Sequence, residues 1–407
     1  MFDTHFRMNE EDAIKYALEK LDVFSARDDL DCEEVGDGNV NYIFRVFSKN
    51  SDNSVIIKQA DVATRLNKMP LSTDRNRIEA ELLQIEEKYA GDMVPKVYLF
   101  DPNMSCLAME DLSDHEIMRY ALMREETFPG FAEKISTFMV ETLANTTDLI
   151  MPAGEKKELV RAYINPEMCD ISERLVYTDP YTVSVKKGDV AVGNIDYVNE
   201  VYQQDMELKT EVAKLKLDFM NNAQALIHGD LHTGSIFIKP GSVKVIDPEF
   251  AFFGPIGYDV GNVIANLMFA WTRALVREPE DQKKHTEFLD WVKDTTKKTV
   301  DLFKEKFERI IGEKAQDLLF SLSEFQSWYV DSVMADTAGV TGLEINRRII
   351  GIAKVKDITT LDDEKRYKAE RILMESAKRF IVERSKYNSG LDYLETFEEL
   401  ADEIIGS

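Results

Sequence analysis

Hydrophobic and polar residues alternate over short stretches in the first third of the chain, a pattern typical of β-strands. The alternation begins at Val40 and resumes at residues 54–58, and two further strands are expected at residues 96–100 and 106–110. Between these two pairs of strands, from about residue 75 to 89, hydrophobic residues take helical spacing. This order predicts a small antiparallel sheet with one main helix packed against it.

Beyond Leu112 the pattern changes to that of long helices. From Gly257 to the C-terminus nearly every segment has helical spacing. Residues 177–205 are polar and contain Pro, Gly and Asn, so we expect a loop or a mobile excursion there. The sequence therefore predicts an α+β, bilobal chain, with a β-rich N-terminal lobe of residues 1–112 and a large, mostly helical lobe of residues 113–407.

Composition narrows the class of protein. The 407 residues are 44% hydrophobic, enough for a sizeable core, and the formal net charge is −25. Nucleic acids and anionic membranes need a basic surface, so we expect neither as a partner. The N-terminus lacks the pattern of a signal peptide, no long apolar run occurs, and the three cysteines have no metal-ligand spacing. A cytoplasmic protein with reduced thiols is expected.

The densest concentration of candidate chemistry lies between residues 226 and 253. His228, Gly229 and Asp230 precede two β-branched stretches, residues 235–238 and 243–246, which a Lys-Pro-Gly-Ser turn joins. Asp247 and Glu249 follow directly. The hairpin should return these two carboxylates to the neighbourhood of Asp230, and gathered carboxylates repel one another unless a cation lies among them. Mg²⁺ with a nucleotide is the simplest candidate.

Six polar residues in or just after this segment have expected roles. Asp230 can accept the proton of a substrate hydroxyl that attacks a γ-phosphate; the alternative is that this carboxylate merely caps a turn. Asp247 and Glu249 are oxygen ligands suited to Mg²⁺. His228 is expected to brace the loop, and His232 either contacts substrate or fills the loop. Asp259, at the start of a predicted helix, is expected to accept hydrogen bonds from loop amides.

A nucleotide would need further residues from the N-terminal lobe. Residues 36–41 form a Gly-rich turn that can cover phosphates with backbone N–H groups, although an ordinary hairpin turn is the commoner reading of so short a motif. Its candidate residues are Gly36, Asp37, Gly38, Asn39 and Asn41. Lys58, at the end of the next strand, can pair with phosphates and with a glutamate of the following helix. Glu79 is preferred over Glu81 for that pair, and the alternative is that all three are surface charges.

Two further sites are less specific in sequence. Glu110, Asp111 and Leu112 close the last strand at the lobe boundary, where backbone groups can face an adenine ring, or the segment is simply a linker. Arg347 and Arg348 form a basic pair among apolar residues of an acidic chain. Most such pairs lie on a solvated helix face, but the flanking Ile and Gly residues favour a partly buried loop or helix start that grips a phosphoryl group or sugar hydroxyls.

In this order, the motifs resemble the protein-kinase-like fold of small-molecule kinases, which include aminoglycoside and choline phosphotransferases. Within that superfamily the chain resembles the 5-methylthioribose kinase family. The resemblance is carried by residues 228–235 (HGDLHTGS), 247–252 (DPEFAF), 109–115 (MEDLSDH) and the Arg347-Arg348 pair. Ser235 stands where most of the superfamily has a metal-binding Asn, and Glu249 replaces a second Asp; both departures resemble this family.

This resemblance implies transfer of the γ-phosphate of ATP to the 1-hydroxyl of 5-methylthioribose in methionine salvage, often by a homodimer. It implies a nucleotide-binding first lobe and a catalytic and substrate-binding second lobe. Asp230 would deprotonate the hydroxyl, Asp247 and Glu249 would hold Mg²⁺, and Lys58 would contact the phosphates. Asp230, His232, Arg347 and Arg348 would face the substrate.

Two other functions remain open from sequence. One is a kinase for an aminoglycoside, choline or another sugar, although the twin arginines argue against a cationic substrate. The other is a kinase-like module that binds nucleotide without turnover, although the full set of Asp230, Asp247 and Glu249 argues against it.

Overall fold

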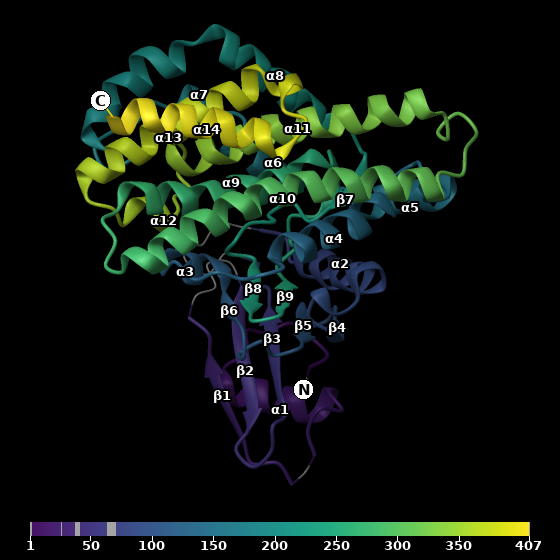
Figure 1. Cartoon of the computed structure of the whole chain (residues 1–407). Coiled ribbons are helices and arrows are strands. Elements are labelled where there is room, and N and C mark those ends of the chain that lie inside the picture. Colours follow the sequence, from purple (N-terminus) through teal and green to yellow (C-terminus); the bar gives the residue numbers. More distant parts are fainter. Residues whose placement is uncertain (1, 26, 37–40, 63–70, 407) are drawn as a thin grey trace.

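The computed structural model describes residues 2–25, 27–36, 41–62 and 71–406. Its N-terminal part forms one five-stranded antiparallel sheet in the order β1-β2-β3-β5-β4. The elements are α1 (Glu10–Lys20), β1 (Leu30–Glu34), β2 (Tyr42–Ser48), β3 (Ser54–Gln59), α2 (Asp74–Ala90), β4 (Val97–Asp101) and β5 (Cys106–Met109). Figure 1 shows this part as the narrow body beneath a broad layer of helices.

Alternation along the strands separates the two faces of this sheet. Val55 and Ile57 of β3 pack in a small core with Tyr16 of α1, whereas Leu107 of β5 points to the other face and joins the main core with Leu83 of α2. The sheet therefore lies between α1 and α2, and Lys58 of β3 is on the α2 side. Sequence patterning missed β1, whose polar residues pair only with β2 at the sheet edge.

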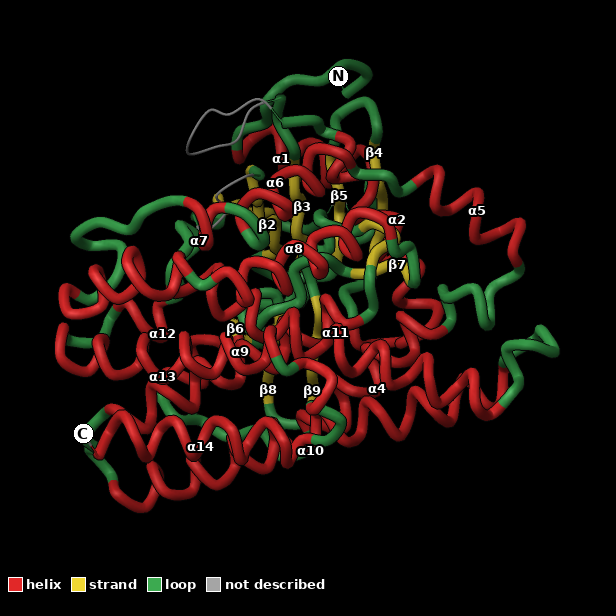
Figure 2. The backbone as a smooth tube through the Cα atoms, turned by 90° about the horizontal axis from the view of Figure 1, so that it is seen from above, coloured by secondary structure: helices red, strands yellow, loops and turns green. Residues whose placement is uncertain are grey.

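The C-terminal part contains many helices, a two-stranded sheet (β10-β7) and a three-stranded sheet (β6-β8-β9). Its elements are β6 (Glu116–Ile117), α3 (Met118–Met123), α4 (Phe131–Ala144), α5 (Ala153–Ala162), α6 (Pro166–Leu175), α7 (Asp179–Thr182), α8 (Met206–Asn221), β7 (Ala225–Ile227), β8 (Ile236–Lys239), β9 (Ser242–Val245), β10 (Phe252–Gly254), α9 (Gly257–Val276), α10 (Gln282–Lys314), α11 (Ser323–Ile349), α12 (Lys356–Thr359), α13 (Asp363–Val382) and α14 (Gly390–Gly406). Seen from above, α10 and α14 lie along one side of this part (Figure 2).

Helix α9 is the centre of the helical part, and almost every one of its side chains is buried. It packs very closely on α11, because a Cβ atom at Gly257 would lie 2.5 Å from the backbone nitrogen of Thr337, and one at Gly261 2.8 Å from its carbonyl oxygen. The two glycines thus let α9 approach the helix that carries the Arg347-Arg348 pair. The start of α9, which carries Asp259, is fixed by the same contact.

Residues 177–205 differ from the loop or mobile excursion that their composition predicts. They contain α7 and short helical turns, and they pack against α13. Glu370 of α13 accepts hydrogen bonds from the backbone N–H of Ala191 at 2.8 Å and from Asn194 at 3.0 Å, and the guanidinium of Arg371 lies 3.5 Å from the ring centre of Tyr197. The polar residues that suggested a loop are therefore partners of a distant helix.

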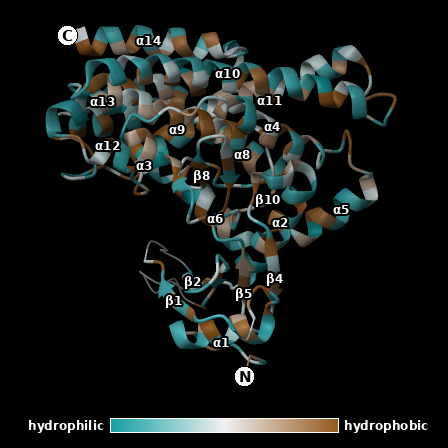
Figure 3. Ribbon diagram, turned by 60° about the horizontal axis from the view of Figure 1, so that its bottom comes forward, coloured by the Kyte–Doolittle hydropathy of each residue, from teal (hydrophilic) through white to brown (hydrophobic). Residues whose placement is uncertain are grey.

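Hydrophilic and hydrophobic residues alternate along the outer helices, as Figure 3 shows, which is the pattern of helices with one face on a core. Within the described ranges, none of the helices combines the length and the apolar character required to cross a bilayer.

A partly buried carboxyl group makes the stability of this fold depend on pH. Burial, together with Asp218 of α8, raises the pKa of Asp336 of α11 to about 7, against the opposing effect of Arg384. The raised pKa means that the folded protein favours the protonated form of Asp336. The free-energy cost of folding with an ionised Asp336 therefore grows as pH rises from about 4 to 7. We expect the advantage of Asp336→Asn over wild type in the free energy of unfolding to be about 2 kcal/mol larger at pH 8 than at pH 5. Urea denaturation at the two pH values measures it.

The control is Asp290→Asn, at an exposed position of α10, which should match wild type at both pH values. A gain from Asp336→Asn that is the same at pH 5 and pH 8 would show that Asp336 is ionised throughout this range.

Candidate active site

The loop that follows β7 holds Asp230 in a fixed position. Gly229 adopts a left-handed conformation (φ +81°), and a Cβ atom there would lie 2.4 Å from the carbonyl oxygen of Phe250, so only glycine fits. Asp259 accepts hydrogen bonds from the backbone N–H groups of His228 (2.7 Å) and Gly229 (3.0 Å). The ring of His228 donates from Nε2 to the carbonyl of Ile246 at 2.9 Å. The predicted bracing by His228 and Asp259 is confirmed.

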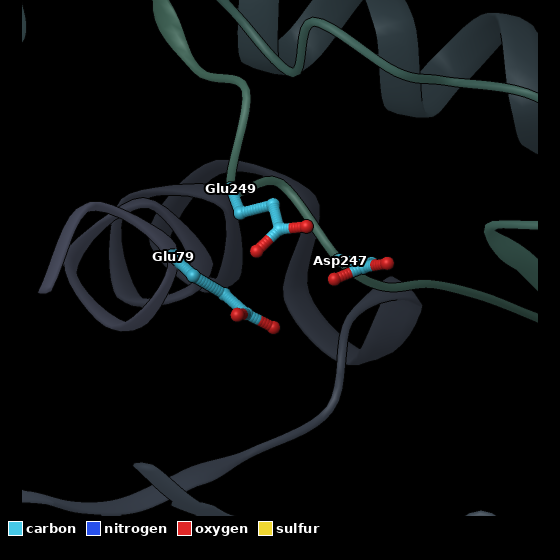
Figure 4. A group of neighbouring side chains, drawn as sticks. All are labelled: Glu79, Asp247 and Glu249. Atoms are coloured by element: carbon cyan, nitrogen blue, oxygen red, sulfur yellow. The ribbon is translucent and has the colours of Figure 1, made fainter. Parts of the chain in front are cut away.

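The β8–β9 hairpin brings Asp247 and Glu249 together, but the third carboxylate beside them is that of Glu79. Oxygen atoms of these three side chains lie within 4.8 Å of one another. In Figure 4, Glu79 extends from its helix toward the loop that carries the other two. Asp230 is not a member of this group, so the expectation that it would be the third carboxylate is corrected. A carboxylate from α2, distant in sequence, takes that place.

Lys58 lies among these acidic side chains. Its Nζ atom is 2.8 Å from Oε1 and 2.7 Å from Oε2 of Glu79, and it also contacts Asp247. Glu81 pairs instead with Arg77 at 2.7 Å. The preference for Glu79 as the partner of Lys58 therefore agrees with the structure.

Burial and charge act together on the protonation of this group. Burial alone would lower the pKa of Lys58, but Asp247, Glu79 and Glu249 raise it above its ordinary value. Burial raises the pKa of Glu79 to about 8, and burial together with Asp247 raises that of Glu249. The carboxylates thus hold Lys58 in its charged form, while their own burial opposes the ionisation of Glu79 and Glu249. The site offers carboxylate oxygens only, the ligands that Mg²⁺ takes, so the donor set fits Mg²⁺.

The Gly-rich turn is described only at its ends. Asp37, Gly38 and Asn39 lie outside the described residues, whereas Gly36 and Asn41 are described. The side chain of Asn41 is 2% exposed, and its Nδ2 donates to Glu249 Oε2 at 3.1 Å. The turn connects the paired strands β1 and β2, which both a phosphate-covering turn and an ordinary hairpin turn require.

At the predicted lobe boundary, the side chains of Glu110 and Asp111 bond to other parts of the protein. Glu110 Oε2 accepts hydrogen bonds from Lys244 Nζ at 3.0 Å and from the backbone of Lys96 at 3.1 Å. Asp111 Oδ2 accepts from Arg45 Nε at 2.7 Å. Leu112 is buried. Any contact of this segment with an adenine ring would therefore use backbone groups, and that role stays a prediction.

Asp230 faces the two adjacent arginines. Arg347 Nη1 donates to Asp230 Oδ1 at 3.1 Å, and Arg348 Nη2 lies 3.6 Å from the same oxygen. Both arginines are at most 8% exposed, so they do not form a solvated face. They end α11 rather than begin a helix or lie in a loop. Burial opposes ionisation of Asp230, yet His232 and the arginines hold the pKa of its carboxyl well below the usual range.

His232 supports the same carboxylate. Its Nδ1 atom accepts hydrogen bonds from the backbone N–H groups of Gly234 and Ser235, both at 3.1 Å. An imidazole nitrogen that accepts carries no proton, so the proton of the neutral ring is on Nε2. Nε2 lies 3.3 Å from Asp230 Oδ2. Burial lowers the pKa of His232, which keeps the ring neutral. His232 thus orients Asp230 and fills the loop.

Sequence reasoning missed three charged residues of the site. Glu344 accepts from Arg348 Nε at 2.6 Å and from Arg347 Nη1 at 3.3 Å, and its helical i+3 and i+4 spacing to them was a readable signal. Arg119 of α3 donates to Asn266 at 3.0 Å beside this cluster. Arg75 lies 3.7 Å from Glu249. No local pattern marks the last two.

Comparison with known proteins identifies the family. The model of the phosphotransferase enzyme family matches residues 89–293 of the 407. The methylthioribose kinase of Cronobacter sakazakii is 36% identical over 87% of this chain and 88% of its own length. That of Bacillus pumilus is 34% identical over 97% of this chain and 98% of its own. The chain belongs to the methylthioribose kinase family.

Among solved structures, the choline kinase of Cryptosporidium parvum is similar over 97% of this chain and 96% of that chain, with a TM-score of 0.47 and 12% identity. As a member of the methylthioribose kinase family, the chain is a kinase that uses ATP and a small-molecule substrate. The predicted family and the bilobal kinase-like fold class are confirmed. The roles of individual residues toward nucleotide, metal and substrate stay predictions.

Proposed function

We propose that the chain transfers the γ-phosphate of ATP to the 1-hydroxyl of 5-methylthioribose, giving 5-methylthioribose 1-phosphate for methionine salvage. The observation that carries this proposal is the identity of about a third to relatives named methylthioribose kinase, along nearly the whole chain. The buried arginines beside Asp230 support it further, because an uncharged sugar that gains a phosphoryl group suits such a site better than a cationic choline or aminoglycoside.

In the proposed reaction, Asp230 accepts the proton of the 1-hydroxyl as that oxygen forms a bond to the γ-phosphorus. The bond from the γ-phosphorus to its bridging oxygen breaks, and ADP leaves with that electron pair. Asp230 is ionised at neutral pH because its pKa is depressed, so it is ready to accept the proton. Arg347 and Arg348 stabilise negative charge on the transferred group. The protein mainly positions the reactants.

Nucleotide and metal are assigned to the other cluster. Asp247 and Glu249 would hold Mg²⁺, which when bound neutralises charge on the phosphates. Lys58 would contact the α and β phosphates, with Glu79 holding its side chain in place. Residues 36–41 would cover the phosphates, and backbone groups of residues 110–112 would face the adenine ring.

We also propose that nucleotide binding belongs to a lobe of residues 1–112, and that catalysis and substrate binding belong to residues 113–407. The end of β5 at Met109 and the change to helices after it support this boundary. The homodimer that the resemblance implies, and a cytoplasmic location where ATP is abundant, belong to the same proposal.

The proposed function is tested by coupled ADP release with 5-methylthioribose, ribose, choline and kanamycin as acceptors. We expect strong stimulation by 5-methylthioribose alone. Phosphorylation at the 1-hydroxyl converts the reducing end of the sugar into a glycosyl phosphate, so the product should no longer react as a reducing sugar. A product that still reduces would place the phosphate on another hydroxyl.

The remaining outcomes decide between the alternatives. Stimulation by choline or kanamycin, with none by 5-methylthioribose, would overturn the proposed substrate. No stimulation by any acceptor would favour a module that binds nucleotide without turnover.

A further inference from the structure

Arg75, the second residue of α2, lies at a junction between the Gly-rich turn and the acidic group. It is 2% exposed. Its Nε and Nη2 atoms donate to Asn41 Oδ1 at 3.2 and 2.9 Å, and its Nε lies 3.7 Å from Glu249 Oε2. Asn41 ends the turn of residues 36–41, and Glu249 follows the hairpin of the C-terminal part. Three segments distant in sequence thus meet at one guanidinium.

The chemistry of these groups fixes the direction of the Asn41 amide. A guanidinium has donors only, so the oxygen of Asn41 must face Arg75. The NH₂ group of Asn41 therefore faces Glu249, to whose Oε2 it donates at 3.1 Å. A carboxylate only accepts hydrogen bonds, so Glu249 selects the same orientation of the amide. Arg75 holds the amide from its oxygen side, at 3.2 and 2.9 Å, and so fixes the position from which Asn41 donates to Glu249.

The backbone of Glu249 is held as well. Asn165, just before α6, donates from Nδ2 to the carbonyl oxygens of Glu249 and Ala251, both at 2.9 Å. With its main chain fixed from one side and its carboxylate from the other, Glu249 has little freedom to turn away from Asp247 and Glu79. A preorganised ligand binds a metal ion more tightly, because less motion is lost on binding.

We propose that Arg75 is a positioning residue of the metal site: by holding Asn41 in place it keeps the Glu249 carboxylate ready for a divalent cation. This inference rests on the proposed role of Asp247 and Glu249 in binding Mg²⁺. It does not depend on which sugar is phosphorylated.

The rest of the contacts of Arg75 are structural, and the test must separate them from this role. Nη1 donates to the carbonyls of Leu71 and Ser72 at 3.3 and 2.5 Å, and Nη2 to that of Asp61 at 3.3 Å. Loss of these bonds would loosen the N-terminal lobe and weaken every ligand alike. Loss of the bonds to Asn41 would weaken the metal selectively.

The experiment measures Mn²⁺ binding by electron paramagnetic resonance, with ADP saturating and no sugar present, and ADP binding without metal by calorimetry. In Arg75→Lys, which keeps the charge but lacks the paired donors, we expect the Kd of Mn²⁺ to rise about ten-fold. Arg75→Lys also loses the carbonyl bonds, so its Kd for metal-free ADP should rise as well, but by less than its Kd for Mn²⁺. Asn41→Leu leaves the carbonyl bonds of Arg75 in place, so it should raise the Kd of Mn²⁺ similarly while the Kd of metal-free ADP changes less than two-fold. The double variant should bind Mn²⁺ no more weakly than Arg75→Lys alone.

Arg77→Lys is the matched control, because Arg77 lies on the same helix, bonds Asp74 and Glu81, and reaches the carbonyl of Ala162 without contacting Glu249. It should leave the Kd of Mn²⁺ unchanged. An unchanged Mn²⁺ affinity in Arg75→Lys and Asn41→Leu would overturn the inference, as would equal weakening of metal-free ADP. A wild-type protein that binds no Mn²⁺ would overturn the metal site itself, and a wild-type protein that binds Mn²⁺ but ignores 5-methylthioribose would overturn only the proposed substrate.

Discussion

Replacing Asp230 with asparagine is expected to lower kcat about a thousand-fold while the Kd of ATP changes less than two-fold. Asparagine has nearly the same shape as aspartate but cannot take the proton of the attacking hydroxyl. Asp230 contacts His232 and the twin arginines, whereas Lys58 and the carboxylates assigned to the nucleotide and metal form a separate cluster. Chemistry should therefore fail while nucleotide binding persists. Single-turnover phosphate transfer and calorimetry with ATP measure the two effects.

Asp290→Asn, the same change at an exposed position of α10, should keep wild-type kcat. The melting temperature of each variant without ligand shows that it is folded. A kcat for Asp230→Asn within ten-fold of wild type would remove Asp230 from the proton transfer, and a loss of ATP affinity equal to the loss of kcat would make it a binding residue.

The elements that sequence patterning predicted well are those fixed by local chemistry. Residues 236–245 form the expected hairpin because a Pro-Gly turn joins two β-branched stretches. The Lys58–Glu79 pair was predictable because Lys58 follows a short β-branched stretch at the end of a strand, and because Leu82 and Leu83 place Glu79 on the packed side of α2. In both cases residues close together in the sequence determine the local structure.

Contacts between distant segments were beyond this reasoning. Asn41 and Glu249 are 208 residues apart, and no repeat in the sequence relates them. The same holds for Glu79 as the third carboxylate of the group, since only the tertiary fold brings α2 beside residues 247–249. Residues 177–205 looked like a loop because their polar side chains have their partners on α13, which patterning within the segment cannot show.

The position of Arg347 and Arg348 in a long helix was misjudged for a different reason. Gly342 and Gly351 suggested a break in the helix, because glycine lowers helix propensity. In the structure α11 continues through Gly342, where a Cβ atom would lie 2.5 Å from the carbonyl oxygen of Ala377 in α13. The glycine serves close helix packing there. Tertiary packing outweighed local propensity, and it placed both arginines in a buried helix end.

That buried position decides what Arg348→Ala should do. Glu344 is 1% exposed and pairs with Arg348 at 2.6 Å, so truncation of Arg348 leaves a buried carboxylate with the longer contacts to Arg347 (3.3 Å) and Asn266 (3.4 Å). We expect the unfolding free energy to fall by about 3 kcal/mol and kcat to fall about a hundred-fold, because a donor to the transferred phosphoryl group is lost. Adding Glu344→Gln should recover much of the stability but little of kcat. Urea denaturation and steady-state kinetics at saturating ATP separate the two effects.

Arg366→Ala is the matched control for this prediction. Arg366 pairs with Glu370 at 2.7 Å with the same i,i+4 spacing, and Glu370 is also 1% exposed, but this pair lies on α13 and has no contact with Asp230 among those described. Its loss should also destabilise the protein, though by less, because Glu370 keeps its hydrogen bonds from Ala191 and Asn194, and it should leave kcat at the wild-type value. If Arg348→Ala loses only stability, as Arg366→Ala should, then Arg348 supports the fold of α11 and Arg347 alone faces the phosphoryl group. If the double variant with Glu344→Gln recovers both stability and kcat, the arginine pair serves only to compensate the charge of Glu344.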